Sequence, residues 1–228
     1  MMAARAIGLV DARYALPVAE CLVGCGAFTV DLGMPRERWF RWKSGIIAPF
    51  GCDCRRINAF PPQRRLVDGA LADAIAGAFP TGDYIVGVAH GGIPWAKAVA
   101  DRLHLPLSYV RAQPRASGGP HVEGLPQRDF RPAARAIVVD DVVASGESAA
   151  HAIRAIRAET GWLIAGVQSI ANWGFPEMRE SLGAWPVRAL TSYPQVIDRV
   201  RAAGLIDDGQ ASQLRHFYAD PRNHAWGD

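Results

Sequence analysis

The sequence predicts an α/β fold in which a mostly parallel central sheet is flanked by helices and carries a small N-terminal hood. Apolar runs at 84–89, 136–139 and 163–171 are typical of strands that are covered on both faces, as in a parallel sheet. The first two runs end in small or polar turns that open helical patterns, which indicates βαβ units. Hydrophobic residues make up 50% of the 228 positions, enough to fill the core of one large domain.

The first sixty residues are predicted to form a helix and the hood. Their elements are, in order, a helix over 10–26, a strand from residue 28, a strand–turn–strand over 38–45 and a short strand over 46–54. The helix is expected to end at Gly24 or Gly26, and the last strand to lie at an edge because Pro49 interrupts it. We therefore predict an N-terminal helix and hood segment over 1–60 and a core with C-terminal helices over 61–228.

The core segment is predicted to alternate strands and helices. Its elements are, in order, a helix over 63–78, a strand over 84–89, a helix to residue 103, strands over 105–111 and from residue 136, a helix over 148–159, strands over 163–171 and 187–191, and helices over 194–203 and 207–218. The crossovers between parallel strands are expected to be right-handed.

Two carboxylates and a small turn follow the apolar run at 136–139. Asp140 and Asp141 stand at the carboxyl end of this predicted strand, where open α/β sheets bind their ligands. The turn over 144–148 opens a helix, so its free N–H groups and the helix dipole suit a phosphate. The acids suit sugar hydroxyls or Mg²⁺. The stretch favours a phosphorylated ribose; the alternative is a buried strand that ends in two solvated acids before an ordinary capped helix.

This stretch resembles the signature with which type I phosphoribosyltransferases bind 5-phosphoribosyl 1-pyrophosphate (PRPP). The resemblance implies the fold of that family, and it implies that Asp140 and Asp141 are catalytic residues that hold the ribose hydroxyls. It also implies that the 5-phosphate is bound by Ala144, Ser145, Gly146, Glu147 and Ser148. The match departs from the family where Ala144 replaces a common threonine and where Glu147 adds a negative charge.

A second loop, which we call the glycine loop, consists of His90, Gly91 and Gly92 after the apolar run at 84–89. A strand, a glycine-containing loop and a helix form an anion-binding arrangement, because glycine has no Cβ to keep the backbone away from a ligand. The resemblance implies that these three residues bind the pyrophosphate of PRPP. The alternative is a tight turn that needs small residues for packing.

The N-terminal segment resembles one branch of the family, the orotate phosphoribosyltransferases. The matching runs are Gly26-Ala27-Phe28-Thr29 and Trp42-Lys43-Ser44-Gly45, and Phe50 follows them. The resemblance implies that Lys43 lies near the pyrophosphate of PRPP and that Phe50 lies against the base. The alternatives are a solvated hairpin lysine and a core aromatic ring.

The connection over 112–128 is long and without periodicity, which is typical of a functional loop. At this place the orotate branch has a mobile catalytic loop, and the resemblance assigns Arg111 and Arg115 to pyrophosphate, with Arg115 in place of the catalytic lysine. An arginine can neutralise developing charge but cannot transfer a proton. The loop also has Ala112 and Ser117 where the branch has lysine and histidine. The alternative is a solvated linker.

Trp173 stands where the orotate branch usually carries an arginine that binds the carboxylate of the base. An indole cannot form a bidentate ion pair, but it can stack on a base, so we predict a base contact for Trp173. The alternative is a core tryptophan.

Composition limits the partners of the chain. A net charge of +3 with dispersed Lys and Arg suits anionic small ligands and gives no basic face for nucleic acid. No apolar run has the length of a membrane span and the first residues do not resemble a signal peptide, so we expect a cytoplasmic protein without a membrane partner. The cysteines are expected to be free thiols; the alternative, structural zinc, conflicts with the close Cys52-x-Cys54 spacing.

The sequence leads to one main hypothesis and two alternatives. The main one is a phosphoribosyltransferase that transfers ribose 5-phosphate from PRPP to a pyrimidine base, foremost orotate, and releases pyrophosphate. The resemblance implies Mg²⁺ as the cofactor and a homodimer, and we assign no residue as a dedicated metal ligand. The alternatives are the same chemistry on a different base and a PRPP- or nucleotide-sensing protein with little turnover.

Overall fold

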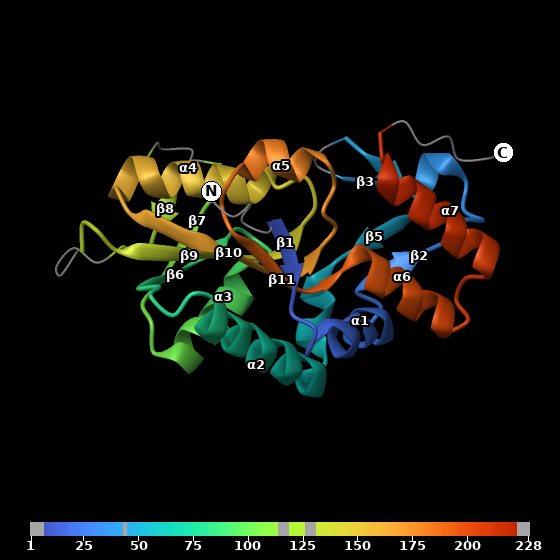
Figure 1. Ribbon diagram of the computed structural model, residues 1–228, viewed down its shortest axis with the longest axis horizontal. Coiled ribbons are helices and arrows are strands. Elements are labelled where there is room, and N and C mark those ends of the chain that lie inside the picture. The colour runs from blue at the N-terminus through green and yellow to red at the C-terminus, as the bar shows by residue number, and fades with distance from the viewer. Residues whose placement is uncertain (1–6, 43–44, 114–118, 126–130, 223–228) are drawn as a thin grey trace, which may run out of the picture.

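The computed structural model describes residues 7–42, 45–113, 119–125 and 131–222. Within these residues, one sheet contains strands in the order β1-β11-β10-β9-β6-β7-β8 (Figure 1). All neighbouring strands are parallel except β7 and β8. The strands are β1 (Ile7–Val10), β6 (Tyr84–Val88), β7 (Leu107–Val110), β8 (Val122–Glu123), β9 (Arg135–Val143), β10 (Leu163–Asn172) and β11 (Val187–Ser192). The predicted mostly parallel central sheet is confirmed.

Helices cover both faces of the sheet, as Figure 1 shows. One face carries α1 (Ala15–Gly24), α2 (Pro61–Ala78) and α3 (Ile93–Leu103), the other carries α4 (Glu147–Thr160) and α5 (Glu177–Leu182), and α6 (Tyr193–Ala202) and α7 (Asp208–Ala219) follow β11 at one end of the molecule. Among the described helices, none is both long and apolar enough to cross a membrane.

Residues 136–139 of strand β9 are all apolar because this part of the strand separates two cores. Ile137 and Val139 pack into the core that α2 and α3 cover, whereas Ala136 and Val138 pack into the core that α4 covers. All four side chains are fully buried. Successive side chains of a strand point to opposite faces, so only an unbroken apolar run can fill both cores. The prediction of a strand covered on both faces is confirmed at this position.

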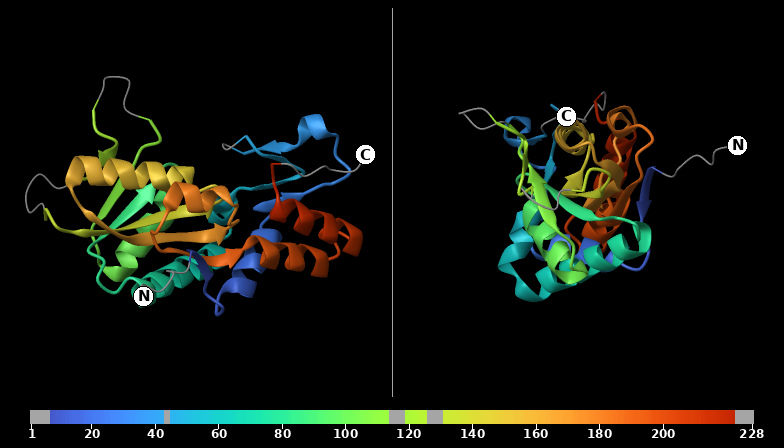
Figure 2. Two further views of the ribbon diagram at one scale, coloured as in Figure 1. Left: turned by 45° about the horizontal axis from the view of Figure 1, so that its top comes forward. Right: turned by 90° about the vertical axis from the view of Figure 1, so that its left-hand side faces the viewer.

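The hood consists of two small antiparallel sheets beside α6 and α7 (Figures 1 and 2). Its elements are β2 (Phe28–Val30) paired with β5 (Phe50–Cys52), β3 (Phe40–Arg41) paired with β4 (Ile47–Ala48), and short 3-10 helices at Arg36–Arg38 and Cys54–Ala59. The predicted hood is therefore present. The division of the chain into two parts at residue 60 stays a prediction.

An aromatic cluster joins the hood to the C-terminal helices. The ring centroid of Phe50 in β5 lies 5.2 Å from that of Tyr193 in α6 and 5.4 Å from that of Phe217 in α7. Trp173, just after β10, has its ring centroid 6.0 Å from Phe28 and 5.7 Å from Tyr193. Edge-to-face and tilted pairs at these distances add to the burial energy of the rings. The position of the hood thus depends on residues near the other end of the chain.

Four short elements differ from the prediction. The strand expected over 46–54 is two strands, because β4 pairs with β3 whereas β5 pairs with β2 in the other small sheet. Strand β1 was not expected: its last residue, Val10, pairs with Ala189 of β11, although a helix was predicted from Val10. Helix α1 begins only at Ala15. A four-residue apolar run next to a helical pattern cannot be recognised as a strand without its partner. Strand β8 has two residues and α5 has six, too few to show a period in the sequence.

Candidate active site

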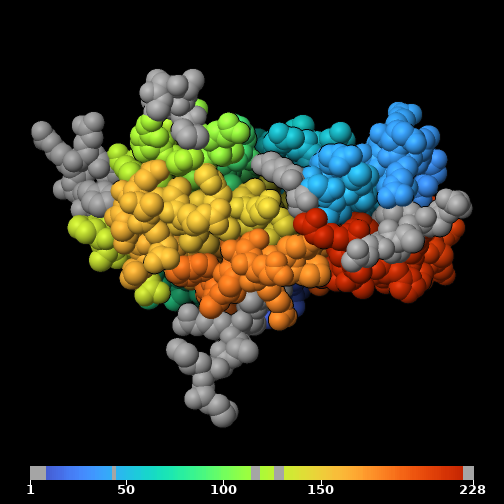
Figure 3. All heavy atoms as spheres, turned by 90° about the horizontal axis from the view of Figure 1, so that it is seen from above, coloured from blue at the N-terminus to red at the C-terminus, as the bar shows by residue number. Residues whose placement is uncertain are grey.

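A cavity of about 340 Å³ lies where the hood meets the carboxyl ends of β6 and β9. In Figure 3 the hood (blue) stands next to the segment that contains the end of β9 and the start of α4 (yellow). The core contributes residues 88–91 and 140–149 to the cavity wall. The hood contributes Phe40, Arg41, Trp42, Cys52, Asp53 and Arg55. Open parallel sheets bind their ligands at this end of the strands.

The two acids are held at the cavity by their own backbone. Strand β9 continues past them because Val142 pairs with Ala171 of β10. Asp140 is 5% exposed, and its Oδ1 accepts a hydrogen bond of 2.9 Å from the N–H of Asp141. Asp141 is half-buried, and its Oδ1 accepts a bond of 2.9 Å from the N–H of Val142. Both carboxyl groups therefore have a fixed direction before any ligand arrives.

The turn over 144–148 ends at the N-terminus of α4. Gly146 precedes the helix with φ of 80°, a left-handed conformation that favours glycine. No side chain caps this helix start among the described residues, so the first N–H groups of α4 are available to an anion at the cavity. Ser145 is buried, whereas Glu147 is exposed, so solvent screens its negative charge.

The glycine loop passes very close to β9. A Cβ on Gly91 would lie 2.3 Å from Oδ2 of Asp141, and a Cβ on Gly92 would lie 2.3 Å from the carbonyl oxygen of Val139. His90 is exposed at the cavity, and the peptide bond between Ala89 and His90 is cis. The loop therefore brings its backbone against the two acids, which a larger side chain at either glycine would prevent.

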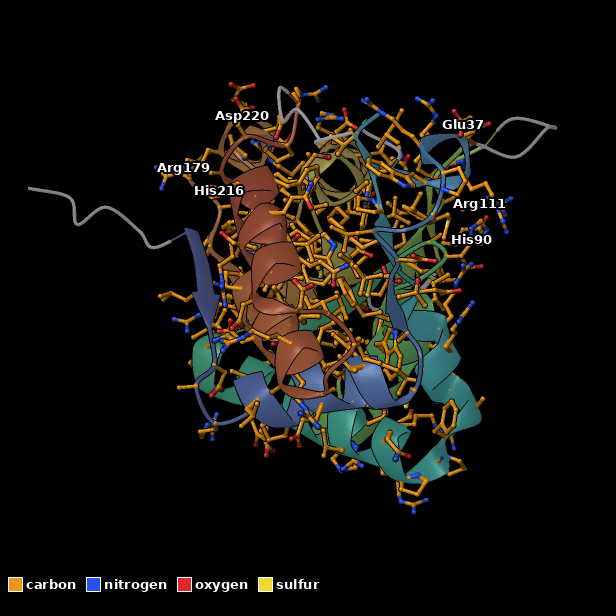
Figure 4. All side chains as sticks on the ribbon, turned by 90° about the vertical axis from the view of Figure 1, so that its right-hand side faces the viewer. Glu37, His90, Arg111, Arg179, His216 and Asp220 are labelled. Atoms are coloured by element: carbon orange, nitrogen blue, oxygen red, sulfur yellow. The ribbon has the colours of Figure 1, made fainter. Side chains whose placement is uncertain are left out.

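Arg111 lies at the end of β7, beside the glycine loop but outside the cavity wall. The N–H of Ala89 donates to the carbonyl oxygen of Val110. The next residue of each segment, His90 and Arg111, therefore lies near the other (Figure 4). Nη1 of Arg111 is 3.2 Å from Oε1 of Glu123 in β8. The pyrophosphate contact of Arg111 stays a prediction.

Two other predicted binding residues, Lys43 and Arg115, lie outside the described residues, as do Ser44 and Ser117. Their assigned contacts with pyrophosphate stay predictions.

Phe50 and Trp173 are buried beneath the cavity rather than in its wall. Phe50 is 2% exposed and Trp173 is fully buried, and both belong to the aromatic cluster. Trp42, which lines the cavity, has its ring centroid 6.0 Å from Phe50 and 6.4 Å from Trp173. Of these three rings, only Trp42 lines the cavity, and the contact of Phe50 and Trp173 with a base stays a prediction.

The hood wall contains charged residues that the sequence reasoning missed. The guanidinium of Arg55 binds Asp53 through two bonds, from Nε to Oδ1 at 2.6 Å and from Nη2 to Oδ2 at 3.1 Å. This hydrogen bonding lowers the pKa of Asp53, and it raises the pKa of Arg55. Arg41 is exposed on β3. The available signal was its place directly before the matched run that begins at Trp42.

The cysteines are free thiols. Sγ of Cys52 lies 3.8 Å from Sγ of Cys54, and this contact, together with burial, raises the pKa of Cys54 well above its usual range. Burial likewise raises the pKa of Cys21 to about 12.

Magnesium fits the oxygen donors at the cavity. Asp140 and Asp141 supply carboxylates, the hard ligands that Mg²⁺ prefers. Within the described residues, no group of three or more His, Cys, Asp or Glu side chains could hold a metal ion. Two carboxylates suit an ion that takes its other oxygen ligands from the phosphates of a substrate and from water.

Comparison with known proteins identifies the family. Residues 55–165 match the family model of the phosphoribosyl transferase domain. The chain is 34% identical over 213 residues to an orotate phosphoribosyltransferase of Bacillus caldolyticus, an alignment that covers 92% of this chain and 98% of the relative. The chain belongs to the orotate phosphoribosyltransferase family. A second family member, from Bacillus subtilis, is 32% identical over 190 residues, or 82% of this chain and 86% of the relative.

Solved structures agree with this family fold. An orotate phosphoribosyltransferase from Aeropyrum pernix has a TM-score of 0.68 at 24% identity and covers 83% of this chain and 99% of its own. A UMP synthase from Leishmania donovani has a TM-score of 0.71 at 23% identity and covers 90% of this chain and 42% of its own. The match to the family model includes the glycine loop, the two acids and the turn over 144–148. It does not include the hood residues between 40 and 53 that also line the cavity.

Proposed function

We propose that this protein transfers ribose 5-phosphate from PRPP to orotate and releases pyrophosphate. The observation that carries the proposal is the meeting of Asp140 and Asp141, the glycine loop and the start of α4 in one cavity. These groups provide acceptors for two ribose hydroxyls and donors for two separate phosphate groups. The relatives named orotate phosphoribosyltransferase support orotate as the acceptor.

In this proposal the chain acts mainly by positioning. The reaction breaks the bond from C1 of the ribose to a pyrophosphate oxygen and forms a bond from C1 to a ring nitrogen of orotate. Asp140 and Asp141 orient the ribose, the N–H groups at the start of α4 fix the 5-phosphate, and the glycine loop faces the pyrophosphate. Negative charge develops on the departing pyrophosphate, where Lys43, Arg111 and Arg115 would stabilise it.

Magnesium, the assembly and the location of the protein belong to the proposal as well. When bound, Mg²⁺ would neutralise part of the pyrophosphate charge, with Asp140 or Asp141 as its protein-side oxygen donor. A homodimer, a cytoplasmic location, and the absence of nucleic acid and membrane partners stay predictions.

The decisive experiment measures pyrophosphate release from PRPP and Mg²⁺ with orotate and, separately, with other pyrimidine and purine bases. We expect release that depends on orotate. Release with another base only would keep the chemistry and change the acceptor. PRPP binding by calorimetry without release on any base would favour a sensor and contradict the enzymatic proposal.

Arg41 is the residue we propose for the carboxylate of orotate. It lines the same cavity as the acids, and no ion pair involves its side chain in the described part of the chain, whereas Arg55 already binds Asp53. A charged hydrogen bond contributes about 1.5–3 kcal/mol, so Arg41→Ala should raise KM for orotate by about ten- to a hundredfold. KM for PRPP should change little, and steady-state kinetics with each substrate varied in turn provides the measurement.

The matched control for this test is Arg38→Ala. Arg38 is also exposed in the hood but does not line the cavity, so both KM values should stay unchanged. Arg41→Lys should recover part of the orotate affinity because it keeps the charge without the bidentate geometry. A rise in KM for PRPP instead of orotate would contradict the assignment.

A further inference from the structure

Two histidines contact the backbone carbonyl oxygen of Arg111. Nε2 of His151 lies 3.2 Å from this oxygen, and Nδ1 of His121 lies 3.4 Å from it. The two rings are edge to face, with centroids 4.9 Å apart. A carbonyl oxygen only accepts, so both ring nitrogens must donate, which fills both of its lone pairs.

The two histidines come from different elements. His151 belongs to α4, the helix whose N-terminus opens on the cavity. His121 directly precedes β8, and its carbonyl oxygen accepts a bond of 2.9 Å from the N–H of Arg111. Arg111 is therefore bonded through both of its backbone polar groups.

Glu159, on the last turns of α4, completes this attachment. Its Oε1 accepts from the N–H of His121 at 2.8 Å, and its Oε2 accepts from the N–H of Val122 at 2.9 Å. Hydrogen bonds to a charged acceptor are stronger than neutral ones. One continuous helix thus carries the start of the proposed 5-phosphate site at one end and holds His121 and Val122 at the other.

The side chain of Arg111 is restrained as well. Its Nη1 is 3.2 Å from Oε1 of Glu123, the residue that pairs across to Tyr109 of β7. The side chain is 39% exposed, so it remains accessible to an anion at the glycine loop. Arg111 is thus held at its N–H, its carbonyl and its guanidinium by groups from two segments, residues 121–123 and α4.

We infer that His151, His121 and Glu159 are positioning residues that fix Arg111 for the pyrophosphate end of PRPP. This inference rests on the proposed function, because it assumes that Arg111 meets pyrophosphate. None of the three residues lines the cavity, so each acts through Arg111 and not on the substrate. A rigid α4 then keeps the 5-phosphate site and the Arg111 site at one spacing, which suits a ligand that carries a phosphate group at each end.

The test begins with His151→Ala. Loss of one hydrogen bond to the Arg111 carbonyl should raise KM for PRPP by about three- to tenfold, while KM for orotate stays within about twofold. His151→Gln should restore KM for PRPP, because the glutamine amide can donate from the place of Nε2. His121→Asn should likewise give a lower KM for PRPP than His121→Ala, because the asparagine amide can donate from the place of Nδ1. His216→Ala, an exposed histidine on α7, serves as the control and should change neither KM (Figure 4).

An Arg111→Ala background separates positioning from general damage to the fold. If His151 acts through Arg111, adding His151→Ala to Arg111→Ala should raise KM for PRPP no further. Equal effects of His151→Ala with and without Arg111 would overturn the inference. An increase with Arg111→Ala but none with His151→Ala would overturn it and leave the proposed function intact, whereas no change with Arg111→Ala would refute the pyrophosphate role of Arg111 itself.

Discussion

Replacing Asp140 and Asp141 together by asparagine will abolish PRPP binding and leave the fold intact. Each carboxylate is expected to accept a hydroxyl of the ribose, and a hydrogen bond to a charged group contributes about 1.5–3 kcal/mol, so the pair corresponds to about a hundred- to ten-thousandfold in affinity. Asparagine keeps Oδ1 and therefore the backbone bonds to the N–H of Asp141 and of Val142. Calorimetric titration with PRPP and thermal unfolding measure the two effects.

The control for the double variant is Asp101→Asn. Asp101 forms an exposed ion pair with Lys97 on α3, away from the cavity, and such pairs contribute only about 0.3–0.5 kcal/mol. PRPP affinity should be unchanged in this variant. A double Asp140 and Asp141 variant that is folded and binds PRPP normally would refute the ribose assignment and the proposed function with it.

Gly91→Ala is expected to have the second largest effect. The new Cβ would lie 2.3 Å from Oδ2 and 2.4 Å from the carboxyl carbon of Asp141, closer than any real contact. Either the glycine loop or the Asp141 side chain must move, and both belong to the proposed PRPP site. Overpacking of this kind costs about 1–3 kcal/mol. If the loop or Asp141 moves out of its binding position to relieve the strain, PRPP affinity should fall by about five- to a hundredfold. The same titration provides the measurement.

Gly69→Ala gives a matched control for this glycine. Gly69 lies within α2, and a Cβ there would have no atom within 4 Å. Alanine in a helix interior is favoured over glycine by about 1 kcal/mol, so this variant should unfold at a higher temperature and bind PRPP normally. Normal PRPP affinity in Gly91→Ala would mean that the close approach of the loop to Asp141 has no role in binding.

The strands of the core could be predicted because their sequence reflects two-sided burial. The run before Asp140 fills one core with Ile137 and Val139 and the other with Ala136 and Val138, and this demand appears as an unbroken apolar stretch. The acids were expected at the end of this strand, but β9 continues past them to Val143, because Val142 and Val143 still pair with β10. The start of α7 could also be predicted from the sequence, since Asp207 and Gln210 form a reciprocal cap.

The hood wall of the cavity could not be predicted in the same way. Strands β3 and β4 have two residues each, so their register comes from pairing and not from a period in the sequence. That register places Arg41 in the cavity wall. The burial of Phe50 and Trp173 likewise depends on rings from α6 and α7, far away along the chain, and no local pattern reports such contacts.

The aromatic cluster has a consequence for how the protein forms during synthesis. Phe50 packs on Phe217, a residue separated from it by most of the chain, so this contact cannot exist until nearly all residues have left the ribosome. The acids and the glycine loop belong to earlier, mostly sequential strand–helix units. The core wall of the cavity can therefore order first, and the hood wall orders last.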